Sequence, residues 1–295
     1  MSQKQGSQTQ ERPAAARTVQ PHTFTSILVH VEPGVTASHR VEVATRLARA
    51  FEAKLIGLGA ETIDAIPAAD PFMGYVTAEW ISMAHEQVDA DLKNAEAAFR
   101  RDAAGVETEW RRVQDFPSHA LARCARAADL VVVGVGGGGG SSYRRADPAD
   151  VVMACGRPVL VTPEHGPHLH ARTIVIAWKD TREARRAVAD AMPFLKRADE
   201  VIVQAVCSDD QLETAAFQTN DVVAALKRHG VNARPNVSTA HSEGVTGEIQ
   251  RIADLNGADL IVAGAYGHSR AAEWAFGGVT RDLLIDPKRY VLMSH

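Results

Sequence analysis

Residues 258–284, ADLIVAGAYGHSRAAEWAFGGVTRDLL, contain the pattern from which the rest of the chain can be understood. The stretch opens with four apolar residues that predict a buried strand. Gly264 and Gly267 follow, and a second pair, Gly277 and Gly278, precedes an amphipathic segment. We interpret the stretch as a strand, a glycine turn, an excursion and a helix. Glycines let backbone N–H groups approach a phosphate closely, and a helix N-terminus adds unpaired donors, so this arrangement favours a nucleotide phosphate.

The spacing Gly264-x2-Gly267-x9-Gly277 resembles the signature of the universal stress protein family. In that family a glycine-serine or glycine-threonine step completes the motif, whereas here Gly278 follows and the hydroxyl is missing. The resemblance implies a Rossmann-like, adenine nucleotide alpha hydrolase-like α/β fold. It also implies an adenine nucleotide as ligand, ATP or AMP, with Mg²⁺ as a companion of ATP. The phosphate end of the motif continues into Val279 and Thr280; the threonine supplies an oxygen to the ligand or only caps its own helix.

The chain contains an internal duplication, which sets its domain organisation. The heptapeptide ADLVVVG at 128–134 recurs as ADLIVAG at 258–264. The openings of the two copies also match, as do their endings. The first copy is longer, and we place its extra residues within 61–86, a stretch with prolines and a glycine. We therefore expect two tandem domains, at 23–164 and 171–295, after a disordered polar tail over 1–22.

Each copy alternates apolar strands with amphipathic helices, which indicates a doubly wound, five-stranded parallel sheet covered on both faces. The predicted strands are 27–31, 55–58, 106–112, 130–133 and 158–161, then 174–178, 201–206, 231–237, 260–263 and 290–293. The predicted helices include 119–127, 183–195, 214–229, 247–255 and 279–285, together with two marked by apolar residues between 41 and 51 and between 88 and 99. Ligands of such sheets gather at the carboxyl ends of the strands, near the switch point.

Composition narrows the classes of partner. The net charge is −4 with mixed signs, which argues against nucleic acid and anionic membranes as partners. No apolar run approaches the roughly 20 residues of a membrane span. Three scattered cysteines without a C-x-x-C pair fit a reducing compartment, and we expect a cytoplasmic protein. The histidines between the two copies suggest a solvated linker more than a metal site, and we expect no bound structural metal.

The resemblance also assigns an acidic residue after the first strand to the ribose-adenine side of the nucleotide. In the second copy this place falls on Lys179, which can donate hydrogen bonds but not accept them. Asp180 lies one step late; it substitutes after a local shift, or it caps the following helix. In the first copy Glu32 takes the acidic place, and Gly134 and Gly137 match the first two glycines of the motif.

The third glycine place of the first copy is occupied by RRADPA, residues 144–149. The carboxylate of Asp147 and the missing N–H of Pro148 oppose a phosphate there, and Arg144 and Arg145 compensate in part. The literal G-x-G-x-x-G over 134–139 follows the fourth strand of the copy instead of the first, so we interpret it as a loop and not as a dinucleotide site. We expect nucleotide to bind in the second copy.

Three functions compete at this point. The first is a stress-response protein that binds adenine nucleotide and acts through its conformation or its partners. The second is a related chain that binds no nucleotide and serves as an interaction module. The third is a nucleotide-dependent enzyme of the same broad fold, such as an adenylating ligase or a nucleotidyl transferase. The catalytic signatures of such enzymes, S-G-G-x-D-S and H-x-G-H, do not follow the first strand of either copy, and we identify no catalytic residue. Slow ATP hydrolysis without a dedicated base stays open. The resemblance implies that the two copies pack as a pseudo-symmetric pair and leaves a further homodimer open.

Overall fold

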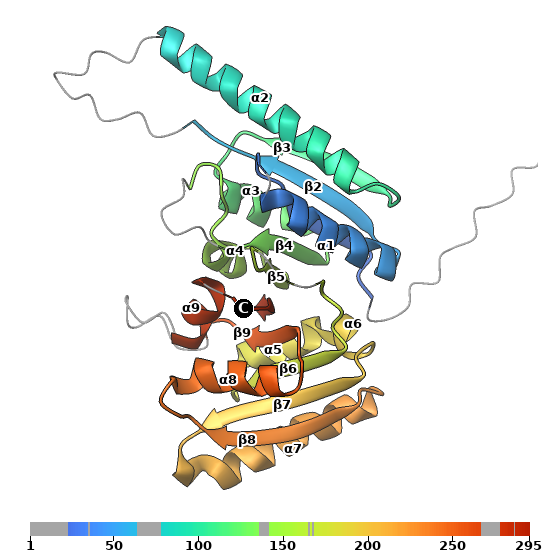
Figure 1. The fold of residues 1–295 in the computed structure, drawn as a ribbon, viewed down its shortest axis with the longest axis vertical. Coiled ribbons are helices and arrows are strands. Elements are labelled where there is room, and N and C mark those ends of the chain that lie inside the picture. The colour runs from blue at the N-terminus through green and yellow to red at the C-terminus, as the bar shows by residue number, and fades with distance from the viewer. Residues whose placement is uncertain are drawn as a thin grey trace, which may run out of the picture.

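The structure is a computed structural model that describes residues 23–34, 36–63, 78–135, 142–164, 166, 168–266, 278–285 and 287–295. The described strands form one sheet of ten, in the order β3-β2-β1-β4-β5-β10-β9-β6-β7-β8 (Figure 1). The strands are β1 (Ser26–His30), β2 (Lys54–Ala60), β3 (Thr108–Val113), β4 (Leu130–Gly134), β5 (Val159–Thr162), β6 (Thr173–Trp178), β7 (Glu200–Cys207), β8 (Ala233–Thr239), β9 (Leu260–Gly264) and β10 (Tyr290–Ser294).

Helices cover both faces of this sheet. One face packs against α1 (Thr36–Phe51), α2 (Ala78–Asp102), α5 (Arg182–Asp190), α6 (Met192–Leu195) and α7 (Leu212–Arg228). The other face packs against α3 (Pro117–Cys124), α4 (Pro148–Ala154), α8 (Gly244–Leu255) and α9 (Gly278–Ile285). The prediction of a doubly wound α/β fold is therefore confirmed.

The strands of each half, β1–β5 and β6–β10, are parallel to one another, as predicted. The two halves are not separate sheets, because β5 pairs with β10 in antiparallel orientation. The aspartates of the repeated heptapeptide do the same work in both halves. Asp129 accepts hydrogen bonds from the backbone of Thr25 and Ser26, and Asp259 accepts them from His170 and Ala171.

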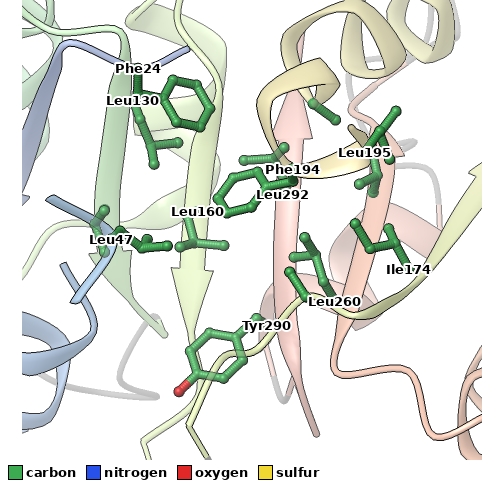
Figure 2. Packing of buried hydrophobic residues seen from close by; sticks show 14 of the residues in the cluster. Phe24, Leu47, Leu130, Leu160, Ile174, Phe194, Leu195, Leu260, Tyr290 and Leu292 are labelled. Carbon is green, nitrogen blue, oxygen red and sulfur yellow. The ribbon is translucent and has the colours of Figure 1, made fainter. Parts of the chain in front are cut away.

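The seam between β5 and β10 is filled by apolar side chains from both halves (Figure 2). Phe24, Phe51 and Phe194 meet edge to face with ring centroids 5.1–5.6 Å apart. Arg197 lies 4.1 Å above the Phe51 ring, and the Tyr290 hydroxyl lies 3.3 Å from the His39 ring across the seam. Buried aromatic contact of this kind ties the halves into one body.

One predicted helix and the predicted extra segment of the first half differ from the structure. The helix predicted over 183–195 is divided into α5 and α6, because Pro193 cannot donate a backbone hydrogen bond and starts a new short helix instead. The predicted extra segment over 61–86 is part helix, since α2 begins at Ala78 and is longer than its counterpart α7. The apolar spacing that identified α2 covers only its buried part, Val88 to Phe99.

Candidate functional site at the two switch points

The sheet has two places where the direction of chain progression reverses. One lies between β1 and β4 in the first half, and the other lies between β6 and β9 in the second half. Loops diverge from the carboxyl ends of neighbouring strands there, which leaves room for a ligand. The predicted site residues that the structure describes follow these four strands or, for α9, the turn after β9. Gly137, Gly267 and Gly277 lie outside the described residues, as does most of the segment over 134–139.

In the first half, the predicted acidic residue, Glu32, forms a buried ion pair with Arg40. Arg40, from the first turns of α1, donates to Glu32 through both ends of its guanidinium, with Nη1–Oε2 2.7 Å and Nη2–Oε1 2.6 Å. Arg40 and Glu32 are 4% and 6% exposed. Arg40 Nη1 also donates to the carbonyl oxygen of His30, and the His30 ring lies 3.3 Å from the carboxylate. Glu32 is therefore held by side chains of its own half.

The protonation states follow from this packing. Burial alone raises the pKa of Glu32, but the Arg40 guanidinium and the His30 ring outweigh it and hold the pKa well below its usual range. Burial lowers the pKa of His30 to about 4, with the charge of Arg40 adding to the effect and that of Glu32 opposing it. At neutral pH the group is a carboxylate, a guanidinium and a neutral imidazole.

Gly134, at the end of β4, adjoins the same ion pair. A Cβ on Gly134 would lie 3.0 Å from Arg40 Nη2, so the guanidinium fills the space that this glycine leaves. The cavity that remains between Glu32, Arg40 and Gly134 offers about 20 Å³ to water, room for one or two molecules. An adenine ring does not fit in it.

Two of the described residues at the predicted phosphate end of the first half make contacts within the chain. Asp147 accepts a hydrogen bond from Ala149 N at 2.8 Å and so caps α4 with a carboxylate. Arg144, predicted to compensate in part, donates to Glu61 at 2.7 Å and to Asp91 at 2.6 Å. Of the two arginines predicted to compensate, Arg144 is therefore engaged by carboxylates of the chain.

The second half is arranged differently after its first strand. Lys179 and Asp180 are exposed, and Asp180 pairs with Arg185. The proposal that Asp180 caps the following helix is wrong: Thr181 is the cap of α5, accepting from Ala184 N at 3.2 Å. The second switch point therefore has a cationic residue, Lys179, after its first strand. The first switch point has the Glu32–Arg40 ion pair, which carries no net charge.

Gly264, at the end of β9, has a packing role. Three residues separate β6 from α5, whereas five separate β1 from α1. The shorter loop brings α5 down onto β9, and a Cβ on Gly264 would lie 2.5 Å from the carbonyl carbon of Glu183. Only glycine admits this approach of two backbones.

The turn after β9 and the start of α9 are joined to each other. Tyr266 has a positive φ of 58°, and its N–H donates to the Thr280 hydroxyl at 3.4 Å. Thr280 is buried, so its hydroxyl belongs to this junction, which neither of its two predicted roles included. Gly278 is exposed, with open space where a Cβ would stand, and Val279 follows it. The N-terminus of α9 is thereby pinned at the carboxyl end of β9.

Carboxylates of the first half influence the Tyr266 phenol. Burial raises the pKa of Tyr266 to about 12, and the charges of Asp147 and Asp150 at the start of α4 add to the effect. The phenol is therefore neutral at physiological pH. Helix α9, which begins beside Tyr266, also contacts α4 of the first half.

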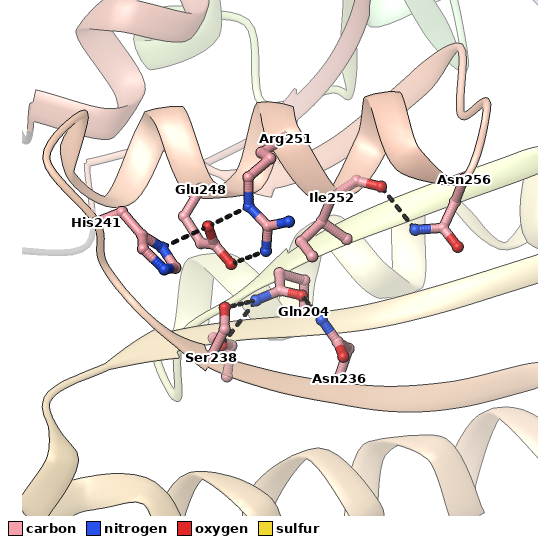
Figure 3. A network of polar contacts seen from close by, with 9 residues as sticks. Gln204, Asn236, Ser238, His241, Glu248, Arg251, Ile252 and Asn256 are labelled. Atoms are coloured by element: carbon pink, nitrogen blue, oxygen red, sulfur yellow. Dashed lines mark hydrogen bonds and ion pairs between the residues drawn. The ribbon is translucent and has the colours of Figure 1, made fainter.

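Sequence reasoning missed one polar group at the carboxyl ends of β7 and β8 (Figure 3). The fully buried carboxylate of Glu248, in α8, accepts from Arg251 at 2.7 and 2.8 Å and lies 3.1 Å from His241. Hydrogen bonding to Arg251 lowers the pKa of Glu248 to about 2 despite its burial. The signal that could have found it is a glutamate directly before Ile249 on the buried face of α8.

A second polar row lies beneath it in the sheet. The Gln204 amide, 1% exposed, donates to Ser238 at 2.8 Å and accepts from Asn236. These groups satisfy one another, so the row stabilises the sheet under α8. Among the described residues, no group of three or more histidine, cysteine, aspartate or glutamate side chains is placed to hold a metal ion. None of the described helices is long and apolar enough to cross a membrane.

Comparison with known proteins agrees with this architecture. No protein-family model and no curated protein sequence matches the chain. Among solved structures, a universal stress protein from Archaeoglobus fulgidus DSM 4304 superposes with a TM-score of 0.64 at 14% identity, over 91% of this chain and 95% of its own. A functionally unknown protein from Pseudomonas aeruginosa PAO1 superposes with a TM-score of 0.56 at 15% identity, over 92% and 93% of the two chains. Over nearly its whole length the chain therefore has the fold of that universal stress protein.

Proposed function

We propose that the chain binds one adenine nucleotide, at the switch point of its second half, and acts in a cytoplasmic stress response through its conformation or its partners. One observation carries this proposal. The Tyr266–Thr280 bond holds the N-terminus of α9 at the end of β9, beside the strand that Lys179 follows. A helix N-terminus and an ammonium group next to a glycine turn together favour a phosphate.

The contrast between the halves supports a single site. In the first half, Asp147 caps α4 and the Glu32–Arg40 pair fills the switch point. In the second half, α9 begins with Gly278, which brings no carboxylate to the helix N-terminus. Gly267 and Gly277 are assigned to the same phosphate site, and Mg²⁺ accompanies ATP there.

The test is a calorimetric titration of the nucleotide-stripped chain with ATP and magnesium. We expect saturable binding at one ATP per chain. Lys179→Glu should weaken binding by at least tenfold, because it replaces an attractive charge with a repulsive one. The matched control is Lys196→Glu, the same charge change at the exposed residue after α6, on the amino side of the sheet.

A second variant separates binding from stability. Gly278→Asp places a carboxylate at the first residue of α9, where it repels a phosphate but stabilises the helix through the helix dipole. Loss of ATP binding in a variant that melts no lower than the parent would locate the phosphate at α9. Unchanged affinity in both variants would mean that the nucleotide, if bound, lies elsewhere.

The filled first half favours one alternative, an interaction module that binds no nucleotide. No heat in the titration up to millimolar ATP would establish that reading. Release of phosphate from ATP by the purified chain would instead indicate an enzyme. Light scattering after size exclusion would show whether the chain also forms a homodimer.

A further inference from the structure

We propose that Arg40 is a built-in occupant of a second ligand site, at the switch point of the first half, and that removing its side chain opens this site to a nucleoside. The inference rests on the proposed function for the class of ligand. According to this inference, the side chain of Arg40 alone decides whether the chain has one ligand site or two.

The position of the guanidinium is the first argument. Arg40 reaches from α1 to the carboxyl ends of β1 and β4, the neighbouring strands that flank the switch point. Its Nη2 lies 3.0 Å from where a Cβ of Gly134 would stand. Glu32, Arg40, Gly134 and Thr162 line the small cavity that remains. The side chain thus stands where ligands of doubly wound sheets bind.

The bonds that Arg40 makes are the second argument. Glu32 accepts one guanidinium hydrogen bond on each carboxylate oxygen. Ribose hydroxyls donate hydrogen bonds, which a carboxylate can accept. The guanidinium offers Glu32 two parallel N–H donors, where a ribose would offer two hydroxyls. Arg40 and a ribose therefore compete for the same acceptor.

The fit of Arg40 is incomplete, which distinguishes it from an ordinary core residue. Among the described residues, no partner accepts from the buried Nε of Arg40, and none pairs with the buried Nε2 of His30. Buried polar atoms without partners are costly to a fold. They show that the space around Glu32 is polar and is filled by a side chain that does not use all of its donors.

The ligand class follows from the surroundings. With Arg40 removed, the residues that line the cavity keep two carboxylates, Glu32 and Glu164, and one cation, Arg145. Asp147 adds a further carboxylate as the cap of α4. Like charge disfavours a nucleotide with two or three phosphates. The opened site should therefore take adenosine in preference to ATP.

The experiment compares the full chain with two variants, using adenosine as the probe in a calorimetric titration. Arg40→Ala removes the guanidinium and most of its volume, and Arg40→Met removes the charge but keeps an apolar chain of similar length. Both leave Glu32 without its main partner, so they differ only in space. We expect Arg40→Ala to bind one more adenosine per chain than the parent, and Arg40→Met to bind the same number as the parent.

Methylguanidinium provides a second readout that does not depend on calorimetry. It should raise the melting temperature of Arg40→Ala and displace the added adenosine, while leaving the parent unchanged. If Arg40→Ala does not fold, Arg40→Ser, which keeps Glu32 and places a small polar side chain beside it, is tested in the same way. No added adenosine in the folded variant, or the same gain in Arg40→Met, overturns the inference.

These outcomes are separable from those for the proposed function. The parent chain reports on the second half alone, because its first site is filled. A parent that binds no nucleotide, beside an Arg40→Ala variant that binds one adenosine, would contradict the proposed function and keep this inference. A parent with one ATP, beside a variant without added adenosine, would do the reverse.

Discussion

A glycine in the same place of a repeated motif does different work in the two halves. Gly134 faces a side chain, the guanidinium of Arg40, whereas Gly264 faces the backbone of Glu183. A side chain can yield to an added methyl group, but two packed backbones cannot. The motif glycine of the second half is therefore needed for the fold itself.

Gly264→Ala should destabilise the chain by about 1–3 kcal/mol, because the new Cβ would overlap the first turn of α5. Gly278→Ala is the matched control. Its Cβ would stand in open space at the start of α9, and alanine favours a helix over glycine by about 0.5–1 kcal/mol. Urea unfolding of both variants checks the opposite signs. An unchanged free energy of unfolding in Gly264→Ala would show that α5 does not pack closely against β9.

Glu248 should account for a defined part of the loss of folding stability at acidic pH. Its folded pKa of about 2 lies below the ordinary value of 4.5, so its stabilisation is complete above pH 4.5 and is lost as the pH falls toward 2. Glu248→Gln should flatten stability against pH in that window relative to the parent. The control is Glu213→Gln, which makes the same change at an exposed residue of α7. An unchanged acid slope in Glu248→Gln would contradict the assignment.

At the scale of the element, the start of α5 sets the geometry of the second switch point. The loop before it is short, and Thr181 ends that loop by capping the helix. Thr181→Ala should cost about 1 kcal/mol, because the N–H of Ala184 loses its acceptor. Thr181→Ser keeps the hydroxyl and should be nearly neutral. Thermal unfolding of the two variants measures the difference. Equal melting temperatures would show that the Thr181 cap does not contribute to stability.

The elements were largely predictable from the sequence, and the side-chain partners at the two switch points were not. Apolar runs such as that of β9 are long enough only for buried strands, and the repeat fixed their order twice. The partner of Glu32 could not be found from the sequence. Arg40 lies eight residues further on, in the next helix, and the residues around it do not indicate that its side chain is buried. The cap at Thr181 depends on how the short loop after β6 places α5, which periodicity does not record. The division at Pro193 follows from the proline itself, although the apolar periodicity continues across it.

At the scale of the whole molecule, the two halves share one sheet and one buried seam. The β5–β10 pairing and the aromatic trio of Phe24, Phe51 and Phe194 cross between them. The His39 ring of α1 contacts Tyr290 of β10, so a helix of the first half also packs against a strand of the second half. Such a seam predicts that the chain unfolds as one cooperative unit.

This prediction can be tested with a residue that belongs to one half only. Phe99, in α2, is fully buried against Trp110 with ring centroids 5.5 Å apart, far from the seam in the strand order. Phe99→Ala should cost about 3–5 kcal/mol, because it leaves a cavity in the core of the first half. Hydrogen exchange of the slowest amides in β1 and in β6 should then accelerate by the same factor. The control, Phe217→Ala on the exposed surface of α7, should change neither. If only the amides of the first half accelerate, the halves unfold independently and the seam does not couple them.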